Sequence, residues 1–108
     1  LVDWGVPGPE DASEDVAYVL DELLHRSVMR VLHHSKHAQA LLLGYCQGGT
    51  LAAMYTALHG AHVAGLVALT APVKFRGAGR FARFVEPEVF DVDAAIDAHG
   101  LMPIEVMS

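Results

Sequence analysis

Residues 41–50, Leu-Leu-Leu-Gly-Tyr-Cys-Gln-Gly-Gly-Thr, constrain the fold of this chain more than any other stretch. An apolar run ends at Gly44, a single reactive side chain follows at Cys46, and a helical pattern begins after Gly48. This order predicts a strand, a sharp turn and a helix, which together form a nucleophile elbow. The usual motif is Gly-x-Ser-x-Gly, and here the only cysteine of the chain stands in place of the serine. We therefore expect a thiol nucleophile.

The spacing around Cys46 has a steric and an electrostatic reason. A nucleophile at so tight a turn sits in strained backbone geometry, and its neighbours two residues to either side must not carry bulk. Gly44 and Gly48 meet this requirement, which favours a nucleophile over a buried structural cysteine. The helix that follows has a positive dipole end, which favours the thiolate. The backbone N–H of Gln47 is the predicted donor of one oxyanion hydrogen bond, and a second donor must come from elsewhere.

Apolar runs and amphipathic stretches alternate along residues 1–73 and predict an α/β fold. Leu1–Val2 has the composition of a strand end, residues 38–43 form an almost continuous apolar run, and residues 63–70 form another. Such runs are typical of a parallel sheet that is covered on both faces. Helical periodicity separates the three runs, so we expect three parallel strands joined by two helices.

The two expected helices have recognisable ends. The first is predicted to begin at Asp11, an N-cap followed three residues later by Glu14, and to run for about five turns. The second follows Cys46 and is expected to end at Gly60. Helical spacing predicts its inward side, made of Leu51, Met54, Tyr55 and Leu58.

Three segments are expected at one edge of the sheet. Ligands bind open α/β sheets at the carboxyl ends of the strands. Trp4, Cys46 and the pair Ala71–Pro72 each follow a predicted strand closely. We therefore expect these residues to surround a common site.

The pattern changes after Val73, and this divides the chain into a core, residues 1–73, and a second region, residues 74–108. Residues 74–84 are rich in glycine, basic and aromatic residues, and a short acidic helix is predicted over 93–99. We interpret the second region as the start of a mobile cap, less ordered from Gly77 onward. A surface excursion without function is the alternative.

Charge and cysteine usage exclude several classes of protein. Seven basic and thirteen acidic residues give a net charge of −6, which argues against binding to nucleic acid. A single cysteine cannot form an internal disulfide and favours a reducing, cytosolic setting. No apolar run reaches the roughly 18 residues needed to span a membrane. The chain starts at Leu1 rather than methionine and stops at Ser108 just after a helical pattern, so we expect an internal fragment of a longer protein.

Three histidines, His33, His34 and His37, cluster near the predicted end of the first helix. Their spacing is compatible with a metal site, but neither a carboxylate nor a cysteine accompanies them. An imidazole is favourable near the negative end of a helix dipole. We therefore expect a solvated helix end and no metal.

Four stretches of the chain together resemble one known family. They are Asp3-Trp4-Gly5 with Pro7, the elbow from Gly44 to Thr50, the segment Thr70-Ala71-Pro72-Val73-Lys74-Phe75, and residues 90–103. In this order they resemble the catalytic subunit of polyhydroxyalkanoate synthase, especially the two-subunit, short-chain type. The resemblance implies an α/β-hydrolase fold, of which this chain would hold the central part and the start of a cap. The family more often has an aspartate at the position of Lys74, so no role is assigned to this side chain.

The resemblance also implies an activity. Members of the family polymerise (R)-3-hydroxyacyl-CoA into polyester and release coenzyme A, with Cys, His and Asp. Only Cys46 can be carried over, because the acid and the histidine are expected downstream of this chain and the second oxyanion donor upstream. His59, His62 and His99 do not match the histidine motif of the family.

The expected partners follow from the same resemblance. They are a 3-hydroxyacyl-CoA substrate, the surface of a polyester granule, a second synthase subunit and further copies of the chain. No cofactor is implied, since the coenzyme A thioester is the substrate. The implied location is cytoplasmic, at polyester granules.

Cysteine suits this chemistry for a reason that is independent of the resemblance. A thiolate that accepts an acyl group from coenzyme A exchanges one thioester for another, so the acyl carbon stays activated for attack by the next hydroxyl.

Two alternative functions remain open. One is a hydrolase similar to dienelactone hydrolase, whose elbow also uses cysteine, and the other is a catalytically inert fragment or granule-associated protein.

Overall fold

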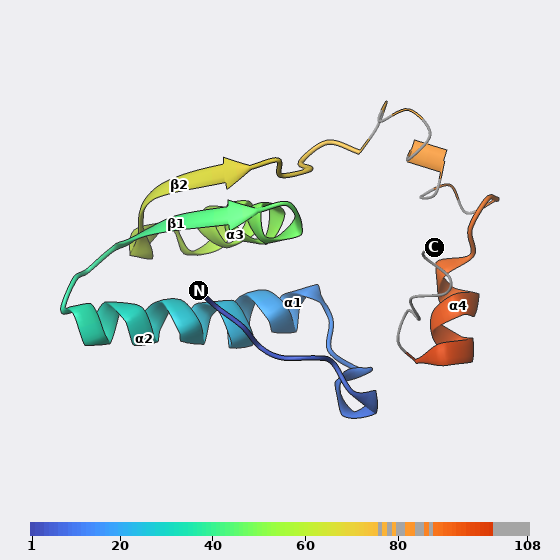
Figure 1. Ribbon diagram of the computed structural model, residues 1–108, viewed down its shortest axis with the longest axis horizontal. Helices are drawn as coiled ribbons and strands as arrows, with labels where there is room; N and C mark the ends of the chain where they lie inside the picture. The colour runs from blue at the N-terminus through green and yellow to red at the C-terminus, as the bar shows by residue number, and fades with distance from the viewer. Residues whose placement is uncertain (76, 78, 80–81, 84–85, 87, 101–108) are drawn as a thin grey trace. The chain divides into compact units, whose positions relative to one another are not determined.

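The computed structural model describes residues 1–75, 77, 79, 82–83, 86 and 88–100. The chain forms two compact units (Figure 1). The first contains Leu1–Trp4 and Glu14–Val73, and the second contains Gly5–Ser13 and Lys74–Ser108. The elbow and both strands belong to the first unit.

A continuous helix forms one side of the first unit. It consists of α1 (Val16–Tyr18), the π-helical segment η2 (Val19–Leu24) and α2 (His25–Ser35). The Asp15 carboxylate caps its start by accepting a hydrogen bond of 2.8 Å from the backbone N–H of Tyr18. Hydrophobic residues at helical spacing turn one side of this helix towards the core, as its periodicity predicts.

The predicted N-cap at Asp11 is wrong. Asp11 ends the short 3-10 turn η1 (Pro9–Asp11), and its carboxylate accepts a hydrogen bond of 2.8 Å from the N–H of Gly8. Asp side chains favour both turns and helix starts, because they can accept hydrogen bonds from nearby backbone N–H groups. The prolines before Asp11 favour the turn, which leaves Asp15 to cap the helix.

Two parallel strands form the sheet. β1 (Ala40–Tyr45) pairs with β2 (Val63–Leu69), with Leu42 opposite Leu66 and Tyr45 opposite Leu69. The parallel arrangement and both strand positions were predicted within two residues.

The prediction of a third strand at Leu1–Val2 is wrong for the residues that the structure describes. These two residues are exposed and have no strand assignment. A strand exists only as part of a hydrogen-bonded ladder. No other described strand lies beside them to form one.

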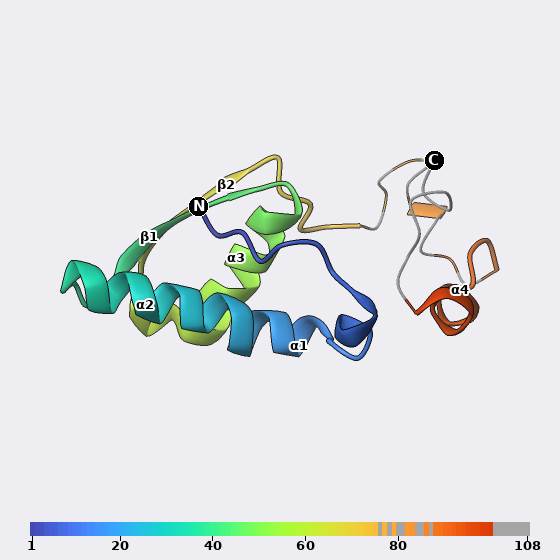
Figure 2. The same cartoon turned by 60° about the horizontal axis from the view of Figure 1, so that its bottom comes forward.

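Helix α3 (Gln47–His59) connects the strands through the 3-10 turn η3 (Gly60–His62). Both α3 and the long helix lie on the same side of the sheet, as Figure 2 shows. The core lies among them and contains Leu20, Val28, Leu32 and Tyr55, with Leu24, Ala40, Leu42, Leu51 and Val63 packed against it.

The predicted inward side of α3 is correct in part. Leu51 and Tyr55 face inward as predicted, but Met54 and Leu58 are exposed. Ala52, which lies on the same helix, is buried instead.

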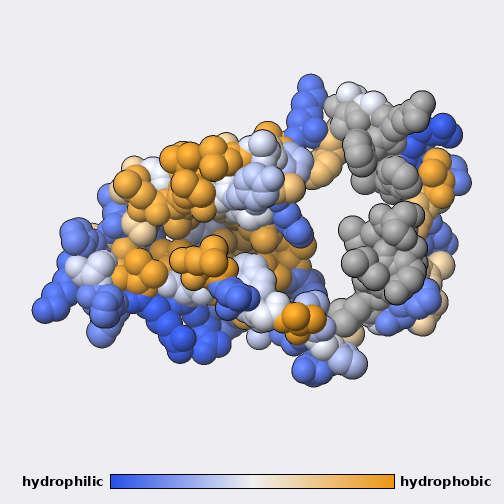
Figure 3. Space-filling view, in the orientation of Figure 1, coloured by the Kyte–Doolittle hydropathy of each residue, from blue (hydrophilic) through white to orange (hydrophobic). Residues whose placement is uncertain are grey.

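The opposite face of the sheet is apolar and bare in the described part of the chain. Leu41, Leu43 and Tyr45 are 79%, 68% and 70% exposed. They alternate along β1 with the inward residues, and Val67 and Leu69 of β2 extend the same surface. Figure 3 shows apolar side chains gathered over the two strands. The predicted coverage of both sheet faces is therefore met on one face only.

The second unit contains one longer helix among its described residues. This is α4 (Val92–His99), which confirms the predicted short acidic helix. The carboxylate of Asp91 caps it through a hydrogen bond of 2.9 Å from the N–H of Ala94. The expectation of lower order from Gly77 onward falls partly on residues 78, 80–81, 84–85, 87 and 101–108, which lie outside the described residues.

None of the helices in the described part is both long and apolar enough to cross a membrane.

Tyr55 links α3 to the long helix. Its side chain is 0% exposed, and its hydroxyl forms a hydrogen bond of 3.0 Å with Nδ1 of His25, thirty residues away along the chain. One turn further along α3, His59 stacks on Tyr55 and contacts the Asp21 carboxylate at 3.0 Å. The helix that begins at Cys46 is thus fixed by both apolar and polar contacts.

Tyr55→Phe is expected to lower the free energy of unfolding by about 1 kcal/mol, because it removes one buried hydrogen bond and leaves His25 without that partner. Denaturant unfolding measures the change. Tyr45→Phe serves as the control, since it removes the same oxygen from an exposed ring. Equal effects of the two substitutions would contradict the role given to the Tyr55 hydroxyl.

The same residue predicts a dependence on alkaline pH. Burial raises the pKa of the Tyr55 hydroxyl above its ordinary value of 10.0. As the pH rises past about 10, the unfolded state loses this proton before the folded state does, so the free energy of unfolding falls. Tyr55→Phe is expected to show a smaller fall than the parent between about pH 9 and pH 11. Identical pH profiles would refute the assignment.

Candidate functional site

The backbone of Cys46 belongs to the sheet and to a helix at the same time. Its N–H donates a hydrogen bond of 2.9 Å to the carbonyl of Leu69, which extends the pairing of β1 with β2. Its carbonyl accepts from the N–H of Gly49 at 2.9 Å and from that of Thr50 at 3.2 Å, which begins α3. Cys46 is therefore held from both sides at the strand-to-helix turn.

This double attachment forces Cys46 into a rare conformation, with φ 52° and ψ −125°. A side chain at positive φ is strained, at a typical cost of about 1–3 kcal/mol. Such strain persists where the surrounding structure determines the backbone fully, and it is concentrated at functional sites. The predicted strained turn at Cys46 is confirmed.

The thiol is free and exposed, and it lies at the positive end of α3. The first N–H groups of a helix have no acceptor within that helix, and here Gln47 and Gly48 supply the first two. Negative charge near Cys46 is stabilised by this arrangement. The geometry suits a nucleophile whose attack creates an oxyanion.

Two glycines allow the close packing at the elbow. A Cβ atom on Gly44 would lie 2.5 Å from the carbonyl oxygen of Gly48, and one on Gly49 would lie 2.6 Å from Cβ of Ala71. A Cβ on Gly48 would have no described atom within 4 Å. The steric argument therefore holds for Gly44 and Gly49, and the described residues give it no support at Gly48.

Ala71 and Pro72 leave β2 beside the elbow. Ala71 packs against Gly49, and the carbonyl of Pro72 accepts a hydrogen bond of 2.8 Å from Oγ1 of Thr50. Thr70 precedes them with φ 48°. A β-branched residue at positive φ is a clear outlier. The structure thus places two strained residues, Cys46 and Thr70, directly after neighbouring strands at the same edge of the sheet.

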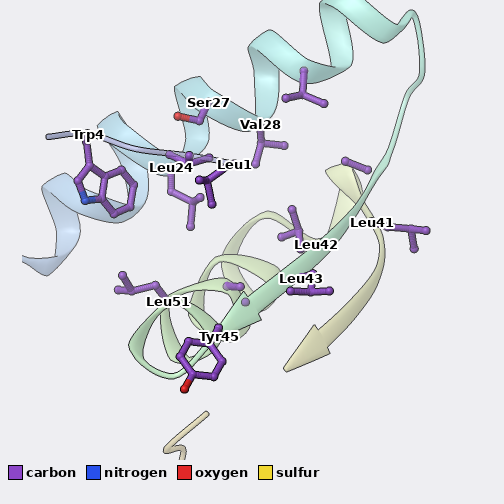
Figure 4. A pocket seen from close by; sticks show the side chains of 16 residues that line it. Leu1, Trp4, Leu24, Ser27, Val28, Leu41, Leu42, Leu43, Tyr45 and Leu51 are labelled. Carbon is purple, nitrogen blue, oxygen red and sulfur yellow. The ribbon is translucent and has the colours of Figure 1, made fainter. Parts of the chain in front are cut away.

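Trp4 also reaches the neighbourhood of the elbow. It lines an apolar pocket of about 480 Å³ together with Gly44, Tyr45 and Gly48 (Figure 4). The long helix contributes Leu24 and Val28 to the same pocket, and further walls come from Leu1, Val2, Ser27, Val31, Ala40, Leu41, Leu42, Leu43, Leu51 and Ala52. Ala71–Pro72 thus lie beside the elbow as expected. Trp4 shares its pocket with Gly44, Tyr45 and Gly48, but Cys46 and Ala71–Pro72 do not line that pocket, so one common site for all of these residues stays a prediction.

The histidines of the first unit lie away from Cys46. His59 is at the far end of α3, which has 13 residues and is therefore about 20 Å long. His25, His59 and His62 form a cluster with Tyr55. No histidine among residues 1–75 hydrogen-bonds to Cys46, and no described group of three or more His, Cys, Asp or Glu residues is arranged to hold a metal.

Gly49 and Thr50 lie within the predicted elbow, but the sequence does not predict their contacts with residues 71–72 or the contact of Leu69 with Cys46. For Gly49 a signal existed, because a second consecutive glycine in the first turn of a helix opposes helix propensity and indicates a packing requirement. The carbonyl of Leu69 and the side chain of Thr50 act through partners more than twenty residues away. No local pattern marks such contacts.

Comparison with known proteins shows the fold family of the chain and several similar proteins. Residues 2–101 match the family model described as alpha/beta hydrolase fold. The chain is also similar to proteins named poly(3-hydroxyalkanoate) polymerase subunit PhaC. The protein from Allochromatium vinosum is 33% identical over 100% of this chain and 30% of its own length. The one from Thiocystis violacea is 31% identical over 100% and 30%, and the one from Synechocystis is 33% identical over 95% and 29%.

The chain thus spans about 30% of the length of these curated relatives. No solved structure shows a significant match to it.

The contrast between the two consecutive glycines at the start of α3 is testable. Gly49→Ala is expected to lower the free energy of unfolding by about 1–3 kcal/mol, because its Cβ would overlap Ala71 and the Gly44 carbonyl. Gly48→Ala is the matched control, and better helix propensity predicts a change between zero and about 1 kcal/mol of stabilisation. Denaturant unfolding of both variants measures the difference. The packing account fails if Gly49→Ala is as stable as Gly48→Ala.

Proposed function

We propose a function from the family of this chain, which belongs to the alpha/beta hydrolase fold family and is similar along its whole length to PhaC polymerase subunits. The full-length protein that contains this chain is a polyester-forming acyltransferase. Its substrates would be (R)-3-hydroxyacyl thioesters of coenzyme A. The observation that carries the proposal is the strained, exposed Cys46 at the elbow of a chain with this similarity.

In the first step, the Cys46 thiolate attacks the thioester carbonyl carbon of the substrate. A new carbon–sulfur bond forms, and the bond to the coenzyme A sulfur breaks. Coenzyme A leaves as a thiolate and takes up a proton. The oxyanion that forms transiently would accept a hydrogen bond from the backbone N–H of Gln47 at the positive end of α3.

In the second step, the hydroxyl oxygen of another 3-hydroxyacyl unit attacks the acyl carbon bound to Cys46. An ester bond forms, the bond to Cys46 breaks, and a base removes the hydroxyl proton. The base, its acidic partner and a second oxyanion donor would come from parts of the protein outside this chain, as the resemblance implies. The His25 and His59 cluster is too distant to act as that base.

A thiol nucleophile suits acyl transfer. Exchange of one thioester for another keeps the acyl group activated, whereas a serine ester would be a poorer donor. Water must also be kept from the acyl-enzyme, and a cap formed from residues 74–108 would serve this purpose. We further propose that the protein acts in the cytoplasm at the surface of polyester granules, with a second subunit and in self-associated form.

Substitution of Cys46 in the full-length protein tests the proposal. Cys46→Ala is expected to abolish coenzyme A release from 3-hydroxybutyryl-CoA, because no acyl acceptor remains. Cys46→Ser is expected to retain about 1% of the parent rate or less, since its hydroxyl must be deprotonated during attack. A thiol-reactive dye measures coenzyme A release, and thermal unfolding checks that each variant is folded.

Product analysis separates the candidate functions. Polyester that contains 3-hydroxybutyrate is the expected product. Free 3-hydroxybutyrate as the main product would instead show a hydrolase similar to dienelactone hydrolase. Coenzyme A release that is unchanged in Cys46→Ala would exclude Cys46 as the nucleophile.

A further inference from the structure

Thr50 joins the nucleophile turn to the chain that leaves β2. Its backbone N–H donates to the carbonyl of Cys46 at 3.2 Å, while its side-chain Oγ1 donates to the carbonyl of Pro72 at 2.8 Å. The two partners lie on opposite sides of Thr50 in sequence, and Pro72 is 22 residues away. A single residue therefore fixes two segments relative to each other.

A second contact lies directly beside this hydrogen bond. Gly49 packs so closely on Ala71 that an added Cβ would come within 2.6 Å of the Cβ of Ala71. The apolar contact sets how near residues 71–72 come to α3. It does not fix their direction along the helix, because the contact of the Ala71 methyl group with the backbone of Gly49 is not directional. The directional hydrogen bond from Thr50 supplies that restraint.

Thr70, which lies between the end of β2 and the contacts of residues 71–72 with α3, is strained. Thr70 has φ 48°, and its neighbour Leu69 is held by the N–H of Cys46. On its other side, Pro72 is held by Thr50. A β-branched residue stays in this conformation only where the flanking chain is fixed. Both restraints come from the elbow.

We propose that Thr50 is a positioning residue for the reaction at Cys46. Its hydroxyl holds the segment Thr70–Pro72 against the turn, so that the backbone beside the thiol stays in one place during acyl transfer. This inference rests on the proposed function, because it takes Cys46 as the nucleophile. Small displacements of reacting groups slow a reaction strongly, so loss of this restraint lowers the rate more than it weakens substrate binding.

Three variants of Thr50 in the full-length protein separate the hydroxyl from the shape of the side chain. Thr50→Val keeps the branched shape and removes the donor. Thr50→Ser keeps the donor and is expected to retain most of the activity. Thr50→Ala is a second variant without the donor, and it has high helix propensity in case the valine variant folds poorly.

Thr56→Val is the matched control on the same helix. Thr56 is also partly buried, and its Oγ1 also donates to a backbone carbonyl, that of Ala52, at 2.7 Å. This bond lies within α3 and does not reach the chain after β2. Thr50→Val and Thr56→Val thus each remove a hydroxyl that donates to a backbone carbonyl, and only the first change frees residues 70–72.

The measurements are kcat and KM for coenzyme A release and the rate at which iodoacetamide alkylates Cys46. Thr50→Val and Thr50→Ala are expected to lower kcat roughly tenfold with KM changed less than about twofold, and to slow alkylation roughly threefold. Thr50→Ser and Thr56→Val are expected to stay within about twofold of the parent in all three. Thermal unfolding confirms that the variants are folded at the assay temperature.

The proposal would be overturned if Thr50→Val and Thr50→Ala both had the kcat and the alkylation rate of the parent. It would also be overturned if Thr50→Val and Thr56→Val lowered kcat equally. Alkylation reports on the thiol without any acyl substrate. If the full-length parent releases no coenzyme A and alkylation slows only in the variants without the Thr50 donor, the positioning role stands and the proposed acyl transfer fails.

Discussion

The backbone of one residue, Cys46, connects the sheet of this chain to the helix that follows. Its N–H pairs with β2 through Leu69, and its carbonyl begins α3. A residue in this situation cannot relax either torsion angle without breaking hydrogen bonds in the ladder or the helix. The strain at φ 52° is therefore stable, and it fixes the thiol at the carboxyl edge of the strands. The contacts of Gly49 and Thr50 exist because this turn brings β1, α3 and the end of β2 together.

The packing behind the elbow keeps α3 in its place. Tyr55, two and a half turns beyond Cys46, is fully buried and bonded to His25 of the long helix. A shift of α3 along its axis would break this bond and move the start of the helix by the same distance, because a helix moves as a stiff unit. The geometry of the nucleophile thus depends on contacts that lie well away from it.

The described residues bury one side of the sheet and leave the other bare. Parallel sheets are normally covered on both faces, and the exposed Leu41, Leu43 and Tyr45 show that the described residues do not meet that rule. The chain spans about 30% of the length of its PhaC relatives. Chemistry at Cys46 is for this reason a property to examine in the full-length protein.

The sequence alone determined the elbow, both strands and the helix between them, because these depend on neighbours within a few residues. Glycine at position 44, the apolar run before it and the helical periodicity after Cys46 act locally. The tertiary structure decided what depends on distant partners. Leu1–Val2 has strand composition but finds no partner strand among the described residues. Thr50 gains its proposed role only because Pro72 arrives beside it.

The same division explains the smaller errors. Asp11 and Asp15 are equally good caps by residue type, and the turn formed with Gly8 decided between them. On α3, Met54 and Leu58 have the right spacing for an inward side, but a helix that is apolar on nearly every side does not reveal which side packs. The structure buries Ala52, which that spacing did not mark. Local chemistry therefore determined the elbow, the two strands and the helix between them, while contacts between distant segments decided whether Leu1–Val2 joins the sheet and which side chains pack inward.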